Sequence, residues 1–262
     1  MELTLLFAIV GSSLFFIGAE RFFPYQSSQS LFRSGFWTDL IGYGLLQSYA
    51  MGLLIAWLGE HLKTQVGVSL FLAHYPISLS GQVLFFLFFH DLNTYLIHRM
   101  QHSFHFLWKT HEAHHSTREV DWLSGIRSSA VEILIYESAK FIPMILLGAD
   151  REVFLIRAWI DSTWGMFIHS NLNIRLGCLA YLLNGPELHR WHHAKYEPKA
   201  YHKNFSTKFS IWDFLFSTAF KPQGQKAHEY GVEDPHYPRD FISQQLLSFG
   251  LDFRSKTFSF LR

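Results

Sequence analysis

Residues 90–115 read HDLNTYLIHRMQHSFHFLWKTHEAHH, and residues 189–193 read HRWHH. Spacings of three and four residues place side chains on one face of a helix, so these stretches predict short helical turns that present imidazoles in one direction. Neutral imidazole is a common ligand of zinc, copper, iron and nickel. Three such clusters, two with the same HxxHH pattern, favour a metal site over solvated or membrane-interface histidines. The clusters are His98 and His102; His111, His114 and His115; and His189, His192 and His193.

The clusters lie within a longer series of motifs. In chain order these are DLNTYLIHRMQH, LWKTHEAHH, FIHSNLN, ELHRWHH, KNFS and IWDFLFST. Over about residues 85–220 they resemble the sterol desaturase / fatty acid hydroxylase superfamily, whose members are integral-membrane, histidine-rich di-iron oxygenases. Two departures replace a turn glycine and affect the expected loop geometry rather than the metal site. Asn204-Phe205-Ser206 stands where the family often has Asn-aromatic-Gly, and Phe216-Ser217-Thr218 where it often has Phe-Gly-Thr.

The resemblance implies a centre of two iron ions that uses O₂ to hydroxylate or desaturate a lipid, with zinc as a possible substitute metal. It also implies a ninth ligand, His169, in FIHSNLN. An electron donor such as cytochrome b5, or a ferredoxin with its reductase, would supply electrons. Four basic residues after the third cluster suit the docking of an acidic donor, or contact with solvent and anionic lipid headgroups. They are Lys195, Lys199, Lys203 and Lys208.

The number of imidazoles also bears on the metal. Structural zinc takes four ligands and catalytic zinc usually three, so nine imidazoles suit two metals with open positions. Soluble di-iron bundles mainly use carboxylates, but Glu112, the one carboxylate at ligand spacing here, points away from the histidine face. Spacing alone leaves zinc, manganese or a mixed site open. His90 lies about 80° off the stripe of His98 and is expected to pack or to support a ligand. Histidines without a motif partner are expected at the surface, with His202 the strongest candidate exception.

The composition indicates an integral membrane protein. The chain has 262 residues, of which 49% are apolar and only 16% charged, against roughly a quarter charged in a typical soluble domain. The positive mean hydropathy agrees. A formal net charge of +1 suggests no nucleic-acid partner, and the single cysteine, Cys178, excludes an intrachain disulfide.

Apolar stretches predict an all-α fold of four to five transmembrane or half-membrane helices in one membrane domain, residues 1–262. Residues 1–97 are expected to hold three transmembrane helices. They are Leu3–Gly18, Phe36–Leu58 and Ser80–Ile97, with a polar turn at Glu60–Val66 and a stretch at Ser69–Ser78 that suits a re-entrant segment.

The rest of the chain is expected to form three further parts. Residues 98–127 carry the first and second histidine boxes. Residues 128–168 form a helical hairpin, Ala130–Leu147 and Val153–Ile168, whose internal charges indicate packing on protein as well as on lipid. Residues 169–262 form a cytoplasmic helical cap with the third box, in which Phe241–Phe249 suits the membrane surface.

Lysine and arginine in short loops predict the orientation. The histidine side is expected to be cytoplasmic, with the amino terminus outside, and all the clusters share that side, as a single metal site requires. Compact length and the lack of an amino-terminal targeting region favour a bacterial inner membrane. The histidine side carries Arg21, Arg33, Arg99, Lys109, Arg118 and Arg127, and the other side only Lys63 and Arg151.

Polar residues near the clusters are expected to support the ligands. Asp91, Tyr95, His98 and His102 follow i, i+4, i+7 and i+11 and share one helical stripe. Asp91 and Tyr95 therefore suit hydrogen bonds to metal-bound imidazoles, since a carboxylate that accepts the second N–H fixes the tautomer of the ring. A buried polar pair that joins two helices is the alternative.

The resemblance implies that the segment with Asn204, Trp212 and Asp213 closes over the metal site. Asp213 is expected to orient a histidine or to cap a helix, and Asn204 to bond to a backbone turn. Asn171, beside His169, is expected to orient a neighbouring imidazole or to end a helix at the interface.

Two alternatives to a lipid oxygenase stay open. A zinc-dependent membrane hydrolase would need a general base such as Glu112 or Asp91 beside a metal-bound water. A non-catalytic metal-binding or transport protein would need polar residues through the spans, and only the last two predicted helices contain several charges. The residues select neither the lipid, among sterol, sphingolipid, fatty acyl, alkylglycerol ether and carotenoid-like substrates, nor hydroxylation against desaturation.

Overall fold

The chain folds as a helical bundle. The structure is a computed structural model that describes residues 2–66, 71–75 and 77–251. In this part of the chain there is no β-sheet, only two isolated bridges, Pro24 with Leu172 and Ala194 with Tyr230, and the predicted all-α class is confirmed. The longer elements are α1 (Glu2–Phe22), η1 (Thr38–Gln47, a π-helix), α2 (Ser48–Val66), α4 (Leu79–Ser103), α5 (His105–His115), α6 (Ala130–Leu147) and α7 (Arg151–His169). The shorter ones are α3 (Phe71–His74), η2 (Ser124–Ile126), η3 (Gly177–Tyr181), α8 (Pro186–His192), η4 (Pro198–Ala200), α9 (Ile211–Leu215) and α10 (Phe241–Ser248).

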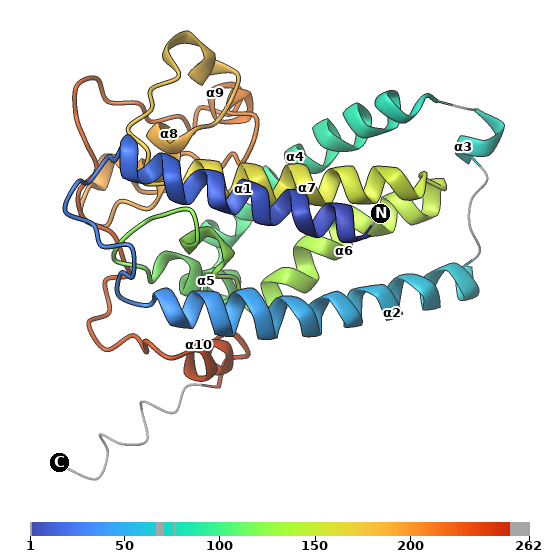
Figure 1. Ribbon diagram of the computed structural model, residues 1–262, viewed down its shortest axis with the longest axis horizontal. Coiled ribbons are helices and arrows are strands. Elements are labelled where there is room, and N and C mark those ends of the chain that lie inside the picture. Colours follow the sequence, from blue (N-terminus) through green and yellow to red (C-terminus); the bar gives the residue numbers. More distant parts are fainter. Residues whose placement is uncertain (1, 67–70, 76, 252–262) are drawn as a thin grey trace.

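The long helices run lengthwise through the molecule, and short elements gather at one end (Figure 1). At that end lie α5, α8, α9 and α10, while the amino end of α1 and the short helix α3 lie toward the other. The chain returns to the α5–α8 end after α1, after α4 and after α7. Segments far apart in sequence therefore meet there, and this end carries every histidine of the three clusters.

Most predicted helices form, and one prediction was wrong. Ala130–Leu147 is a helix at its predicted bounds, and Val153–Ile168 lies inside α7. The predicted polar turn Glu60–Val66 is instead the last part of α2, because side-chain polarity alone does not break the helical hydrogen-bond ladder and no proline or glycine stands at residues 60–66. The predicted re-entrant stretch Ser69–Ser78 lies partly outside the described residues.

Two described helices are long and apolar enough to cross a membrane, by length and composition: Leu3–Phe22 and Thr38–Leu62. Only 11% and 22% of their most apolar stretches are buried within the protein. Their large side chains are therefore exposed, including Phe7, Phe15 and Trp57. Helices that expose such surface are typical of lipid contact rather than of a soluble core, which supports association with a membrane.

Local signals explain where α6 begins and ends and where α8 begins. The side chain of Ser129 accepts a hydrogen bond from the backbone N–H of Glu132, which satisfies one free donor in the first turn of α6. Gly148 ends that helix in the left-handed conformation, at φ +74°, which glycine adopts without strain. Pro186 occupies the first turn of α8, where its missing N–H costs nothing.

A buried ion-pair network holds the loops at the α5–α8 end. Nη2 of Arg33 lies 2.7 Å from Oδ2 of Asp39 and 2.7 Å from Oδ1 of Asp121. Nε of Arg127 lies 2.7 Å from Oδ1 of the same Asp39. The two arginines thus join three separate segments inside the protein.

Candidate metal centre

Nine histidines converge at the α5–α8 end in two groups, and they are the nine predicted ligand candidates. The first group comprises His98, His102, His111, His115 and His192, and the second comprises His114, His169, His189 and His193. Within each group, one ring nitrogen of every histidine lies within 4.8 Å of those of the others.

Each HxxHH motif contributes to both groups. On α5, His111 and His115 are one helical turn apart and join the first group, while His114 turns into the second. At α8, His192 joins the first group, while His189 and His193, the residue that follows the helix, join the second. The two groups are adjacent, because the rings of His115 and His193 lie 4.5 Å apart and stack.

The site is buried, and burial keeps the rings neutral. Desolvation lowers the pKa of His111, His114 and His115 well below the usual value, and repulsion between neighbouring imidazolium charges lowers it further. The same two causes lower the pKa of His189 and His193. Neutral imidazole is the form that binds a metal ion.

In the first group, fixed acceptors set the tautomers of two rings. Nδ1 of His98 donates to the backbone carbonyl of Phe205 at 2.6 Å, and Nδ1 of His111 donates to Oε1 of Glu132 at 2.5 Å. Both Nε2 atoms therefore carry lone pairs, and they face each other at 2.9 Å. Two lone pairs at that distance repel, so this arrangement fits a cation that binds both atoms.

The second group repeats this arrangement with different acceptors. Nδ1 of His114 donates to the carbonyl of Arg127 at 3.1 Å, and Nδ1 of His169 donates to the carbonyl of Gly165 at 2.8 Å. The Nε2 atoms of His114 and His169 then face each other at 3.1 Å. This pair also fits a shared cation.

Unpartnered ring nitrogens complete the test of fit. Among the described residues, Nε2 of His102 and Nε2 of His192 are buried without a hydrogen-bond partner. In His192, Nδ1 donates to the carbonyl of Lys203 at 2.8 Å, so Nε2 has a free lone pair. Buried polar atoms usually have partners, and a metal ion would supply one here. The residues present fit a metal centre with ligands from both groups.

Asp91 and Tyr95 have other partners than predicted. The carboxylate of Asp91 accepts bonds from the backbone N–H of Lys208 and Phe209 and from Nε1 of Trp212, and its described bonds include no cluster histidine. Tyr95 shares a hydrogen bond with Thr218. Both residues lie one to two helical turns before His98 on α4. At that level of the helix the 207–218 segment packs against α4, so their side chains bond to this segment instead. They anchor that segment to α4.

Asn171 and Asp213 also act on backbone rather than on imidazole. Asn171 exchanges two hydrogen bonds with the main chain of Gln26. Asp213 accepts bonds from the N–H groups of Phe205 and Ser206, both at 2.9 Å. The carbonyl of Phe205 accepts the hydrogen bond from Nδ1 of His98. Asp213 therefore orients that ring indirectly, by holding the backbone of residues 205–206.

Two residues close to the centre were not singled out from the sequence. Glu132 appeared only as a charge within a predicted span, although its place in the first turn of an amphipathic helix hinted at an inward role. Gly125 lies so close to His169 that an added Cβ would be 2.5 Å from Nδ1 of the ring. The short sequence SGI around it carries no recognisable signal.

The two serines that stand in place of the family's turn glycines differ in backbone conformation. Ser217 has φ +58°, a conformation that favours glycine. Ser206 is not among the described residues with positive φ, so a serine fits there. Asn204 also has φ +58°, and its side chain bonds to the carbonyls of Leu188 and Phe220, which holds the turn.

A cavity of about 170 Å³ reaches the first group. His102, His115 and His192 line it together with Trp108 and His202. His202 is exposed, lies 6.4 Å from the ring of His102 and has φ +56°. It is thus a neighbour of the centre that belongs to neither group.

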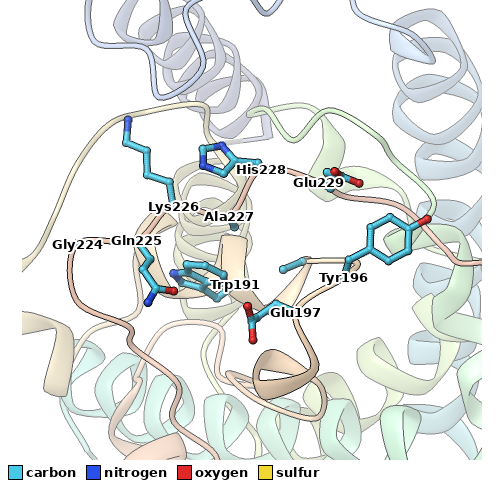
Figure 2. Close-up of a pocket in the computed structure, with 10 residues that line it drawn as sticks. Trp191, Tyr196, Glu197, Gly224, Gln225, Lys226, Ala227, His228 and Glu229 are labelled. Atoms are coloured by element: carbon cyan, nitrogen blue, oxygen red, sulfur yellow. The ribbon is translucent and has the colours of Figure 1, made fainter.

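Another hollow lies beside α8. It measures about 560 Å³, and Figure 2 shows Trp191 and Glu197 on its wall, with Lys226, His228 and Glu229 on the facing segment. None of the nine clustered histidines lines it.

Of the lysines proposed to dock a donor, Lys208 is buried and paired with Asp161 at 2.7 Å, so it is not a docking residue.

The chain is similar to curated lipid-modifying oxidoreductases. It is 30% identical to the ornithine lipid hydroxylase OlsE of Rhizobium tropici over 154 residues, which cover 59% of this chain and 46% of that protein. It is 30% identical to the alkylglycerol monooxygenase of Homo sapiens over 145 residues, covering 55% and 32%. It is 24% identical to the C-4 methylsterol oxidase erg25 of Schizosaccharomyces pombe over 182 residues, covering 66% and 59%.

The chain thus spans less than half the length of the first of these relatives. No solved structure matches it. The model of the fatty acid hydroxylase family matches residues 83–218, a range that contains all nine histidines of the two groups and just over half of the chain. The chain therefore belongs to the fatty acid hydroxylase family of oxidoreductases.

Proposed function

We propose that this protein is a membrane-embedded di-iron enzyme that uses O₂ to hydroxylate or desaturate a lipid. The observation that carries the proposal is the pair of adjacent histidine groups in which fixed Nδ1 donors turn Nε2 lone pairs toward one another. Nine neutral imidazoles in two groups exceed the needs of one zinc ion. The relatives are named for an ornithine lipid, alkylglycerol and a methylsterol, and all of these are lipids.

The spacing of the facing ring nitrogens fits ligands that would share one metal ion. Two nitrogens about 2.1 Å from one ion are about 3.0 Å apart at a right angle and about 3.4 Å apart in a tetrahedron. The facing Nε2 atoms of His98 and His111 are 2.9 Å apart, and those of His189 and His169 are also 2.9 Å apart. Other facing Nε2 pairs are 3.1–3.2 Å apart, so the distances fit imidazoles that share one ion, and the choice of iron comes from the family resemblance.

Bound iron would supply the redox chemistry for breaking an unactivated C–H bond, which side chains cannot do alone. The chain's own residues prepare the site for it. Glu132 and the carbonyls of Phe205, Arg127 and Gly165 hold protons on Nδ1 atoms and orient the rings. Burial excludes water from the groups, and the cavity beside His102 gives a route of access.

The proposal also covers the electron donor, the orientation of the centre and the kind of membrane. Electrons come from a separate donor such as cytochrome b5 or a ferredoxin with its reductase. The centre faces the cytoplasm, and the membrane is a bacterial inner membrane. The excess of arginine and lysine in loops at the histidine end supports this orientation, and a bacterial protein is among the relatives.

The test supplies detergent-purified, iron-loaded protein with a reductant, O₂ and a membrane lipid extract, and follows products by mass spectrometry. We expect a lipid product 16 mass units heavier, or 2 lighter, whose ¹⁸O label in the hydroxylated case comes from O₂. The His192→Ala variant is the control and is expected to give little product. A hydrolysis product that forms equally well without O₂ would indicate a hydrolase instead, and no oxygen-dependent product from any lipid class would overturn the oxygenase.

A further inference from the structure

A second polar site lies between α4, α6 and α7, apart from the histidine groups. It is a cavity of about 160 Å³, room for roughly five water molecules at about 30 Å³ each. Its wall includes His90 from α4, Lys140 and Glu137 from α6, and Arg157 and Asp161 from α7. In Figure 1, α6 and α7 diverge from their shared turn, and residues of both helices line this cavity.

Two side chains in this wall have unused hydrogen-bonding atoms. His90 is 1% exposed, and in the described part of the chain neither of its ring nitrogens has a partner. Arg157 is 3% exposed and donates to Asp161 through Nη2 at 3.2 Å, while its Nε and Nη1 are unpartnered. Buried polar groups without partners are rare because they cost stability, so both residues indicate a ligand in the cavity.

The charges around the cavity balance, which bears on the kind of ligand. Lys140 lies 2.8 Å from Glu137, and Lys208 lies 2.7 Å from Asp161. Counting every charged group in these contacts, three cations stand against three carboxylates. They are Lys140, Arg157 and Lys208 against Asp91, Glu137 and Asp161. An added anion would disturb this balance, so an uncharged group with acceptor oxygens fits better.

The cavity has a defined distance from the histidine groups. His90 precedes His98 by eight residues on α4, and Asp161 precedes His169 by eight residues on α7. At 1.5 Å per residue, both helices place the cavity about 12 Å from the nearest ligand candidates. A molecule that reaches both places must be elongated, as a lipid is.

We propose that this cavity binds an uncharged, oxygen-bearing group of the lipid substrate, a hydroxyl or ether, through Arg157 and His90. That the lipid is a substrate rests on the proposed function, but its binding in this cavity does not require turnover. Arg157 donates to the oxygen, and neutral His90 has one donor and one acceptor to offer a hydroxyl. Binding there sets which carbon of the chain lies near the histidine groups, and so determines the position that reacts.

The test is equilibrium binding of radiolabelled 1-O-hexadecylglycerol to the iron-loaded full chain without O₂, so that it does not depend on activity. In Arg157→Leu we expect the Kd to rise about tenfold, because a hydrogen bond from a charged donor is lost. In His90→Phe we expect a rise of about fivefold with no loss of thermal stability, since His90 makes no described hydrogen bond that phenylalanine would break. Arg151→Leu, an exposed change at the start of the same helix, is the matched control and should leave the Kd unchanged.

Competition distinguishes the possible ligands. Unlabelled palmitate is expected to compete more weakly than unlabelled 1-O-hexadecylglycerol, and inorganic phosphate is not expected to compete. Equal Kd values in all variants would overturn the site, and competition by phosphate would indicate a site for free anions instead. If His90→Phe and Arg157→Leu weaken binding while no oxygen-dependent product forms, the lipid site stands and the oxygenase proposal fails.

Discussion

Glu132 and His111 are joined by a hydrogen bond of 2.5 Å, in which Nδ1 of the imidazole donates to Oε1 of the carboxylate. The two residues come from different helices, α6 and α5. Since the carboxylate holds the proton on Nδ1, Nε2 of His111 keeps its lone pair and faces His98. One helix thus supplies the ligand candidate, and another determines how its ring is oriented.

Replacing Glu132 should weaken metal binding in the first group. We expect Glu132→Leu to lower its metal affinity about 10- to 100-fold, the usual effect of removing a group that orients a ligand. Glu132→Gln should have a smaller effect, because its amide oxygen still accepts from Nδ1. Competition with a calibrated chelator measures the affinity. Glu152→Gln, an exposed change in the first turn of α7, is the control, and unchanged affinity in Glu132→Leu would contradict the assigned role.

Two neighbouring histidines at the end of α8 should affect different metal ions. His192 belongs to the first group and His193 to the second, so each alanine variant should lower the metal content from about two ions per chain to about one. The double variant should bind almost none. Elemental analysis of purified protein gives the ratio, with exposed His228→Ala as the control. Loss of all metal in one single variant would show that the groups are not separable.

Adding one methyl group at Gly125 should disturb the second group. A Cβ at this position would be 2.5 Å from Nδ1 of His169, so Gly125→Ala must push that ring aside. We expect the loss of about one metal ion per chain. We also expect a loss of about 1–3 kcal/mol in the free energy of unfolding, seen as a lower thermal midpoint. Elemental analysis and thermal unfolding in detergent measure these two effects.

Gly165→Ala is the matched control for that change. Gly165 lies on α7 one turn before His169, and a Cβ there would meet nothing within 4 Å. Its carbonyl still accepts from His169, and alanine favours a helix over glycine by about 0.5–1 kcal/mol. This variant should therefore keep both metals and be slightly more stable. If the two variants behave alike, the close contact with His169 has no functional consequence.

Replacing serine by glycine should stabilise the protein at only one of the two positions that depart from the family motifs. Ser217 has φ +58°, and a left-handed conformation costs a non-glycine residue about 1–2 kcal/mol. Part of this gain is offset by the greater freedom of glycine in the unfolded chain. We therefore expect Ser217→Gly to stabilise the protein by about 0.5–1 kcal/mol, measured as a higher thermal midpoint.

Ser206→Gly provides the comparison. Ser206 is fully buried and is not among the described residues with positive φ, so glycine there would relieve no backbone strain, would add freedom to the unfolded chain and would remove a hydroxyl beside Asp213. We expect no gain, or a loss of up to about 1 kcal/mol. A gain at residue 206 together with none at residue 217 would contradict the backbone geometry described for this turn.

Local patterns in the sequence predicted much of the helical framework. Ala130–Leu147 formed at its predicted bounds because a serine N-cap precedes it and a glycine ends it, and both signals are local. Glu60–Val66 was predicted wrongly because a run of polar residues resembles a turn, although helices tolerate such residues at exposed positions. The partners of Asp91 were also missed, because they come from residues 207–212, more than a hundred positions away.

The sequence by itself predicted which nine histidines meet: spacing within the three clusters indicated eight of them, and the resemblance of the FIHSNLN motif to the family added His169. Only the tertiary structure decided how the nine divide. His114 lies in a different group from His111 and His115, because α7 brings His169 to one side of α5 and α4 brings His98 to the other. It also decided what holds the rings, since the carbonyl of Phe205 reaches Nδ1 of His98 across 107 residues of chain. Side-chain periodicity predicts the face of one helix, but backbone acceptors on distant segments become neighbours only when the whole chain packs.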